Sequence, residues 1–204
     1  MNLRRLPIRL EGLQFKGDRD YLQGAEILPL ALRALSDDEP RNAISAIDIV
    51  FHALAHTGLT LAEDVPPGHA ANAQLSCTVN GTRHKLFLIE NGRPITERHP
   101  YPEEQIVSVT AIDASSATAT STARLPFTNI QRWIAMTKAL HHAMYPLARG
   151  KWLFARAKLV TYDETAHDGA EHRVQIQSDF GGKLTRSALA VDGRKFGDIF
   201  FALA

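Results

Sequence analysis

One short segment of the sequence concentrates side chains that could do chemistry. Asp18-Arg19-Asp20-Tyr21 places two carboxylates, a guanidinium and a phenol just before a run with helical periodicity. A carboxylate there can act as a general base on an attacking water molecule. The N–H groups of the first helical turn, including that of Gly24, can stabilise a developing oxyanion. Arg19 can grip a phosphate or carboxylate, and Glu26 adds a second acid inside the first turn.

The same segment also has a purely structural interpretation. Asp is among the commonest residues immediately before a helix, so Asp20 can be an N-cap and Arg19 its surface partner. The helix itself is predicted over 25–35, because apolar residues recur there at helical spacing. Pro29 falls inside this range, and it is tolerated only if the helix starts close to it or kinks. Both interpretations therefore depend on where the helix begins.

A second set of candidate residues is Asp48, His52 and His56, which are spaced four apart. On a helix such residues would lie about 6 Å from each other, and a metal ion could bridge them. On a strand the separation is about 13 Å, which no single ion spans. The stretch 47–55 alternates and is rich in Ile, Val and Phe, which favours a strand. We therefore expect no metal site, although His52 alone can line a cleft or meet solvent.

The other candidate residues carry weaker signals. His141 and His142 lie on a second predicted helix, which begins with a capping box at Thr128 to Gln131. His141 lies near the apolar stripe and can reach a site beneath the helix, but an exposed His near a helix C-terminus is more common. Cys77 is expected to be a buried small hydrophobic residue. There is no glycine-rich phosphate loop, nucleophile elbow or dinucleotide fingerprint, so no cofactor is expected.

Composition limits the class of protein. The chain has 204 residues, is 45% hydrophobic and 22% charged, and carries a net charge of +1. This excludes general disorder and gives no strong attraction to nucleic acid. No apolar run approaches the roughly 18 residues that cross a bilayer. The opening segment 1–7 is basic, but no apolar block of the signal type follows it. We therefore expect a cytoplasmic protein without a membrane span or a nucleic-acid partner.

Most of the remaining sequence is typical of antiparallel strands. Asn80-Gly81 and Asp192-Gly193 are strong signals for tight hairpin turns. Alternating or β-rich runs predict further strands over 7–16, 75–79, 84–89, 106–112, 114–123, 151–161, 172–178, 184–191 and 196–203. Each half thus has the order strand, helix and several antiparallel strands. This weak internal repeat predicts two α+β units, residues 1–112 and 113–204, which together form one compact domain.

One helix followed by a long antiparallel meander resembles the hotdog fold, and two tandem copies resemble the double-hotdog arrangement. The segment from Ala46 to Leu61 is similar to the strand–turn–Gly–strand stretch after the helix in hotdog thioesterases. The resemblance implies two tandem hotdog-like units, each a curled antiparallel sheet wrapped around one long helix. It also implies a substrate that is an acyl group carried on coenzyme A or acyl carrier protein, as in fatty acid or polyketide metabolism.

The departures from the family pattern bear on the reaction. Hotdog dehydratases carry a His in the loop before the helix and an acid within it. Here the loop 17–24 has no His, and Pro29 occupies the position of the acid. The resemblance therefore favours thioester hydrolysis over dehydration of a hydroxyacyl thioester. The implied roles are a general base (Asp20 or Glu26), an auxiliary acid or base (His52) and substrate contacts (Arg19, Tyr21 and Gly24).

Two other interpretations stay open at the level of sequence. A non-catalytic acyl-binding or assembly protein would also show a divergent catalytic loop. An unrelated α+β protein would show only one helix wrapped by a sheet, or a helix over 43–55 in place of a strand. A homodimer is compatible with all of these interpretations, because a tandem unit needs no partner to complete its sheet but can still pair.

Overall fold

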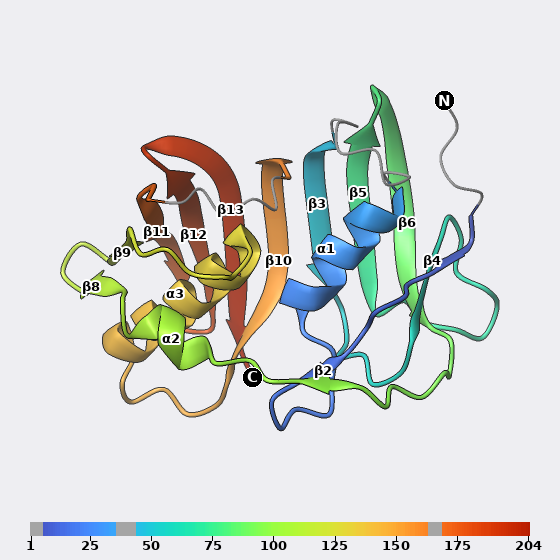
Figure 1. Cartoon of the computed structure of the whole chain (residues 1–204), viewed down its shortest axis with the longest axis horizontal. Helices are drawn as coiled ribbons and strands as arrows, with labels where there is room; N and C mark the ends of the chain where they lie inside the picture. The colour runs from blue at the N-terminus through green and yellow to red at the C-terminus, as the bar shows by residue number, and fades with distance from the viewer. Residues whose placement is uncertain (1–5, 36–43, 163–168) are drawn as a thin grey trace. The chain divides into compact units, whose positions relative to one another are not determined.

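A computed structural model describes residues 6–35, 44–162 and 169–204, so residues 1–5 of the basic opening segment lie outside the described residues. The chain divides into two compact units, Met1–Tyr101 (unit 1) and Pro102–Ala204 (unit 2). Figure 1 shows the elements of each. Within the described residues, no helix is long and apolar enough to span a bilayer.

Unit 1 is built on an antiparallel sheet whose strands follow the order β1-β4-β6-β5-β3. In the order of the chain these are β1 (Ile8–Arg9), β3 (Ser45–Phe51), β4 (Leu59–Ala62), β5 (Ala73–Val79) and β6 (Thr82–Glu90). Helix α1 (Gly24–Leu35) lies across one face of the sheet (Figure 1). A separate parallel pair joins β2 (Phe15–Lys16) to β7 (Arg98–His99).

The core of unit 1 follows from strand alternation. In β5 every second side chain is buried, and in β4 Leu59 and Leu61 are fully buried. Helix α1 contributes Leu28 and Leu32 to the core. The predicted hairpin at Asn80-Gly81 is confirmed, because these residues join β5 to β6 with φ of 50° and 80°. Both angles are left-handed, which Asn and Gly adopt at the least cost.

Unit 2 has a second run of antiparallel strands, in the order β10-β13-β12-β11-β9-β8. Their bounds are β8 (Ala111–Asp113), β9 (Thr118–Ser121), β10 (Trp152–Thr161), β11 (His172–Phe180), β12 (Leu184–Val191) and β13 (Arg194–Leu203). Helix α3 (Asn129–Met144) packs against β8, β9, β10 and β11, and it also contacts the short helix α2 (Glu103–Val107).

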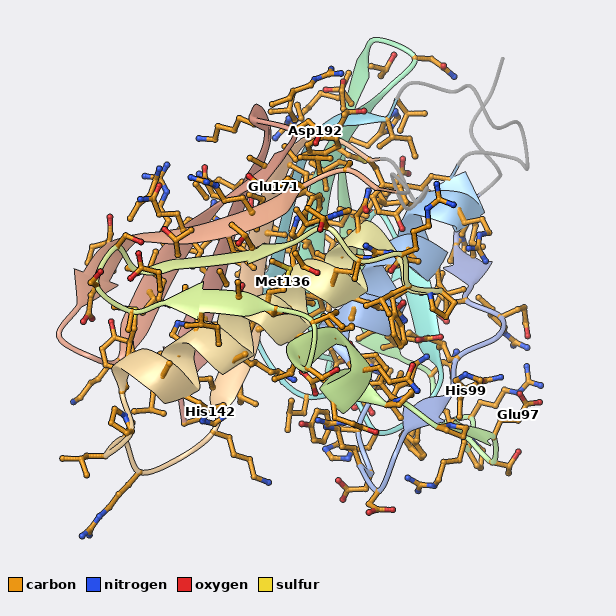
Figure 2. The ribbon with its side chains drawn as sticks, turned by 60° about the vertical axis from the view of Figure 1, so that its left-hand side comes forward. Glu97, His99, Met136, His142, Glu171 and Asp192 are labelled. Carbon is orange, nitrogen blue, oxygen red and sulfur yellow. The ribbon has the colours of Figure 1, made fainter. Side chains whose placement is uncertain are left out.

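Helix α3 begins as the sequence predicts. The Thr128 hydroxyl accepts from the Gln131 N–H, and the Gln131 side chain accepts from the Thr128 N–H, so the capping box is confirmed. Met136, in the middle of the helix, is fully buried, whereas His142, near its C-terminal end, is exposed (Figure 2). The residues 132–137 are all buried and cover every side of the helix, so α3 is a buried helix that reaches solvent at its C-terminal end.

Three predictions about the fold are wrong. We expected two tandem units with one long helix each. The described residues instead contain three short helices, of 12, 5 and 16 residues, and their main strands belong to one eleven-stranded antiparallel sheet. The apolar run 106–112 is not a strand but the end of α2 followed by β8, because only Ile106 of its large side chains is buried. Asp20 is not the N-cap of α1, since the helix begins only at Gly24.

Candidate active site

The loop before α1 is fixed to the segment that follows β3. The Leu22 N–H donates to the Ala55 carbonyl at 2.8 Å. The His56 Nδ1–H donates to the carbonyl oxygen of Asp20, also at 2.8 Å. This bond leaves His56 Nε2 as the acceptor nitrogen of the neutral ring. The main chain on either side of Tyr21 is therefore held from outside the loop.

The other end of the same loop is held from β7. Arg98 Nη1 donates to the carbonyl oxygen of Arg19 at 2.8 Å and also to that of Gly17. The Arg98 guanidinium lies 5.5 Å from the centre of the Phe15 ring, which belongs to the paired strand β2. A loop with this many long-range bonds can hold a side chain in one place, as a catalytic group requires.

The start of α1 has no Ser, Thr or Asp cap. The Gln23 carbonyl accepts from the N–H groups of Glu26 and Ile27, at 2.8 and 3.0 Å. The Gln23 amide oxygen, in the orientation that satisfies the side chain, accepts from Arg19 Nε and Nη1 at 2.9 and 2.8 Å. Gly24 and Ala25 precede the first intrahelical bonds, so their N–H groups are the ones a helix directs outward to an anion.

The two candidate bases differ in their surroundings. Asp20 is exposed, next to the half-buried Tyr21. Glu26 is instead ion-paired to Lys16 at 2.9 Å, and these side chains are only 16% and 10% exposed. The Glu26 charge lies in the first turn, where it also interacts favourably with the helix dipole. Asp20 is therefore the better placed of the two carboxylates to receive a proton from water.

The set Asp48, His52 and His56 is divided by the structure. The prediction of a strand is confirmed, since β3 spans Ser45–Phe51. His52 is exposed just after β3, and its main-chain N–H donates to the Asn72 carbonyl at 2.8 Å. It is His56, not His52, whose ring contacts the loop before α1. Among the residues described, no three His, Cys, Asp or Glu side chains are grouped so that they could hold a metal ion.

Glu90 is a residue of this region that the sequence does not single out. Its Oε1 accepts from the N–H groups of His56 and Thr57, at 2.6 and 2.8 Å, and from the Thr57 hydroxyl at 3.2 Å. Burial raises the pKa of Glu90, but these hydrogen bonds and one from Asn72 outweigh burial and lower it below its usual value. Glu90 is therefore an anion that anchors the segment bearing His56. Only long-range pairing reveals this role, because in the sequence Glu90 simply follows the predicted strand 84–89.

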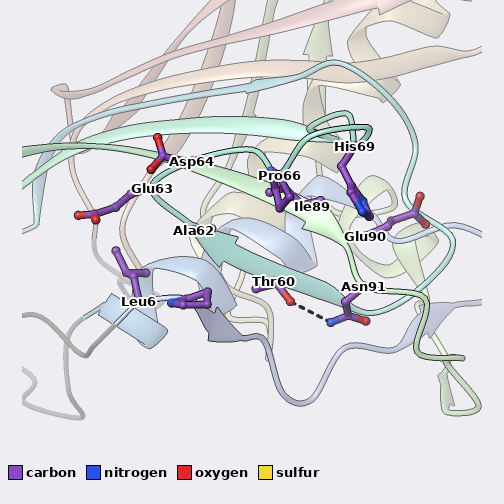
Figure 3. Close-up of a pocket in the computed structure, with 11 residues that line it drawn as sticks. Leu6, Thr60, Ala62, Glu63, Asp64, Pro66, His69, Ile89, Glu90 and Asn91 are labelled. Carbon is purple, nitrogen blue, oxygen red and sulfur yellow. Dashed lines mark hydrogen bonds between the residues drawn. The ribbon is translucent and has the colours of Figure 1, made fainter.

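A cavity of about 460 Å³ lies beside Glu90 (Figure 3). Thr60 and Ala62 of β4 line it, and they point to the sheet face opposite the buried Leu59 and Leu61. Asn91 Nδ2 closes one side by donating to Thr60 Oγ1 at 3.1 Å. The cavity is thus on the face of the sheet away from the core of unit 1, and the start of α1 does not line it.

The start of α3 in unit 2 is closed by a buried arginine. Arg132 is 2% exposed, and its guanidinium donates to the carbonyls of Ala123, Leu125 and Phe127, at 2.8, 2.6 and 3.4 Å. Together with the capping box, these bonds give partners to the N–H groups of Thr128 and Gln131 and to three carbonyls before the helix. This helix terminus therefore has a structural role.

His141, near the C-terminal end of α3, is also part of the core. His141 is fully buried, its Nε2 is 2.7 Å from the Thr185 hydroxyl, and its ring stacks on Trp152 with centroids 4.1 Å apart. Burial, with a smaller effect of the neighbouring His142, lowers the pKa of His141 to about 4. The ring is thus neutral near pH 7, and its exposed neighbour His142 is the solvated residue of the pair.

Comparison with known proteins identifies the fold. No protein-family model and no curated protein matches the sequence. Among solved structures, the tesB protein of Mycobacterium avium subs paratuberculosis is 12% identical, with a TM-score of 0.55, covering 99% of this chain and 96% of that one. A pyran synthase domain from module nine of the sorangicin pathway is also 12% identical, with a TM-score of 0.50, covering 93% and 91%. The predicted resemblance to hotdog-fold proteins is confirmed at the level of the fold.

Proposed function

We propose that this chain acts on acyl thioesters, carried by coenzyme A or by an acyl carrier protein, and that it hydrolyses them. The observation that carries the proposal is the exposed Asp20 carboxylate in a fixed loop before a helix start that has no Ser, Thr or Asp cap. The hotdog fold supports the substrate class. The absence of His from the loop 17–24 favours hydrolysis over dehydration.

In the proposed reaction, Asp20 takes a proton from a water molecule while the water oxygen forms a bond to the thioester carbonyl carbon. The N–H groups of Gly24 and Ala25 stabilise the oxyanion of the tetrahedral intermediate. The carbon–sulfur bond then breaks, and the proton held by Asp20 passes to the departing thiolate. The products are a carboxylic acid and a free thiol, so no further reactant is needed.

The other candidate residues take supporting roles in this proposal. We propose that Tyr21 and Arg19 contact the substrate near the carbonyl, and that His52 is an auxiliary acid or base. Glu26 is a weaker candidate for the base, because its carboxylate is already held in an ion pair with Lys16. We further propose that the protein works in the cytoplasm.

The test is mass spectrometry of the purified protein incubated with a panel of acyl and 3-hydroxyacyl coenzyme A thioesters. Release of free coenzyme A is expected, and the rates rank the substrates. Gain or loss of water would instead indicate a hydratase or dehydratase. Binding without conversion would indicate an acyl-binding protein, and neither binding nor conversion would contradict the substrate class.

A further inference from the structure

The place of the candidate base Asp20 depends on its main chain. Its side chain is exposed, and among the residues that the structure describes none bonds to its carboxylate. Its carbonyl oxygen, by contrast, accepts from His56 Nδ1–H at 2.8 Å, and two residues later the Leu22 N–H donates to the Ala55 carbonyl at 2.8 Å. The position of the carboxylate therefore follows from the bonds that hold the backbone beside it.

The contact of His56 with the loop has a fixed chemical form. A carbonyl oxygen can only accept, so Nδ1 carries the hydrogen and Nε2 of the neutral ring carries none. Leu22 and Ala55 pair as an antiparallel bridge and are 3% and 1% exposed, so their side chains enter the core. His56 is the next residue and is exposed. The buried pair and the bond from His56 thus hold the same loop from two sides.

Glu90 holds His56 in turn. One carboxylate oxygen, Oε1, accepts from the N–H groups of His56 and Thr57 at 2.6 and 2.8 Å, and from the Thr57 hydroxyl at 3.2 Å. Hydrogen bonds to a charged acceptor are shorter and stronger than those between neutral groups. The main chain of His56 is therefore fixed at the point from which its ring extends to Asp20.

The buried amide of Asn72 fixes Glu90. Asn72 is 7% exposed, and its Oδ1 accepts from the Glu90 N–H at 3.1 Å. Its Nδ2 donates to the Leu54 carbonyl at 3.0 Å and to Glu90 Oε2 at 3.4 Å. Both polar atoms of this side chain thus have partners, as buried polar groups require. A continuous chain of hydrogen bonds runs from Asn72 through Glu90 and His56 to the backbone of Asp20.

We propose that His56 and Glu90 are positioning residues for the hydrolysis assigned to Asp20, because the Nδ1–H of His56, held by Glu90, sets where the Asp20 carboxylate lies. This role rests on the proposed function and adds to it two residues that act through the loop. A shift of about 1 Å in a catalytic group can cost about 100-fold in rate. Loss of the bond to Asp20 should therefore lower kcat much more than it changes KM.

Two amide variants separate the nitrogens of the His56 ring. The amide nitrogen of Asn stands where Nδ1 of His stands, whereas that of Gln extends to the place of Nε2. H56N keeps the donor and should retain kcat within about three-fold, while H56Q and H56L should lower kcat at least about ten-fold with KM within about two-fold. A loss in H56N as large as in H56L would overturn the role of the Nδ1–H and indicate that Nε2 acts in the reaction.

A double-mutant cycle tests Glu90. E90M removes the acceptor of His56 and Thr57, so it should lower kcat at least about five-fold in the unchanged protein but little in H56L, because both residues act through one bond. E90Q, which keeps an acceptor oxygen, serves if E90M does not fold. Equal factors in both backgrounds would overturn the role of Glu90. The matched control H69L removes an exposed histidine of unit 1 outside this chain of bonds and should keep kcat within about two-fold.

Hydrogen–deuterium exchange of the loop 17–24 tests the positioning without turnover. The Leu22 N–H and its neighbours should exchange faster in H56L and E90M and at an unchanged rate in H56N and H69L. This pattern in a protein that hydrolyses no thioester would contradict the proposed function alone, and the positioning of Asp20 would stand. Unchanged exchange in H56L and E90M would overturn the inference, as would full kcat of H56L in a protein that does hydrolyse thioesters.

Discussion

The starts of α1 and α3 solve the same physical problem in different ways. Both helices leave N–H groups at the first turn without intrahelical acceptors. In α3 the Thr128 capping box meets this need, and the buried Arg132 occupies three carbonyls of the preceding segment. In α1 the cap position is Gln23, whose side chain binds Arg19 instead. The start of α3 thus has a side-chain cap, whereas the start of α1 has none, and we propose that its first N–H groups serve the substrate oxyanion.

The buried faces of the two helices differ in the same direction. The buried side chains of α1 are all apolar, whereas α3 buries Asn129, Arg132, Thr137 and His141. Polar groups in a core need partners. Asn129, Arg132 and His141 Nε2 bond to strands and loops of unit 2, whereas the Thr137 hydroxyl donates to the Trp133 carbonyl within the helix. The buried polar side chains of the two helices are therefore all in unit 2, whereas the exposed charged loop is in unit 1. Four experiments can break or sharpen this comparison.

Removing the buried arginine should have the largest effect. Arg132→Met leaves three carbonyls without their donor, which is expected to cost about 3 kcal/mol of unfolding free energy. Urea denaturation followed by tryptophan fluorescence measures it, since both tryptophans, Trp133 and Trp152, lie in unit 2. The control Arg19→Met, in the loop of unit 1, should change this transition by less than about 1 kcal/mol. Equal losses would remove the distinction between the two helix starts.

Acid should weaken unit 2 in a defined window. His141 is neutral in the fold with a pKa of about 4, but its pKa is about 6.5 when the chain unfolds. Below pH 6.5 only the unfolded chain takes up this proton, so stability is full above pH 6.5 and falls as the pH drops towards 4. The loss amounts to roughly 3 kcal/mol at pH 4. His141→Phe keeps an aromatic ring against Trp152 and should make the urea midpoint less dependent on pH between 6.5 and 4. An unchanged dependence of the midpoint on pH would contradict the role of His141.

The candidate base should matter for turnover and not for stability. Asp20→Asn keeps the size of an exposed side chain but cannot take a proton, so hydrolysis is expected to fall by about 100-fold or more. The melting temperature should stay nearly constant. Asp18→Asn, an exposed neighbour in the same loop, is the matched control and should retain most of the activity. Full activity of Asp20→Asn would contradict the role of Asp20 as the general base.

The smallest effect should come from the capping box of α3. Thr128→Ala removes the hydroxyl that accepts from the Gln131 N–H, and it should cost about 1 kcal/mol. Thermal unfolding measures this loss. Turnover should be unchanged, because the start of α3 has no part in the proposed reaction. A large loss of activity with little loss of stability would move the candidate site to unit 2.

Local patterns predicted much of this structure. The capping box at Thr128, the hairpin at Asn80-Gly81 and the strand at 47–55 were all readable, because each depends on residues close together in the chain. The same holds for burial of Cys77, which is fully buried. The run at 106–112 was misread, since a short apolar run with one buried residue has no clear period.

The candidate site was only partly predictable. Asp20, Arg19 and Gly24 were found together because they are neighbours in sequence. The role of Glu90 could not be read, because it depends on bonds to His56 and Thr57 more than thirty residues away. The ion pair between Glu26 and Lys16 was likewise invisible, although it separates the two candidate bases. Charge and spacing identify a loop, but only the fold shows which of its groups are occupied.

The burial of Cys77 makes its thiol a chemical probe of the opening of unit 1. It is the chain's single cysteine and lies in β5, between β3 and β6. Burial raises the pKa of its thiol to about 11, so little reactive thiolate exists at neutral pH. A disulfide reagent can therefore modify it only when the strands of unit 1 separate. The rate of labelling would follow the opening of unit 1, while tryptophan emission follows unit 2, and one unmodified protein would record both.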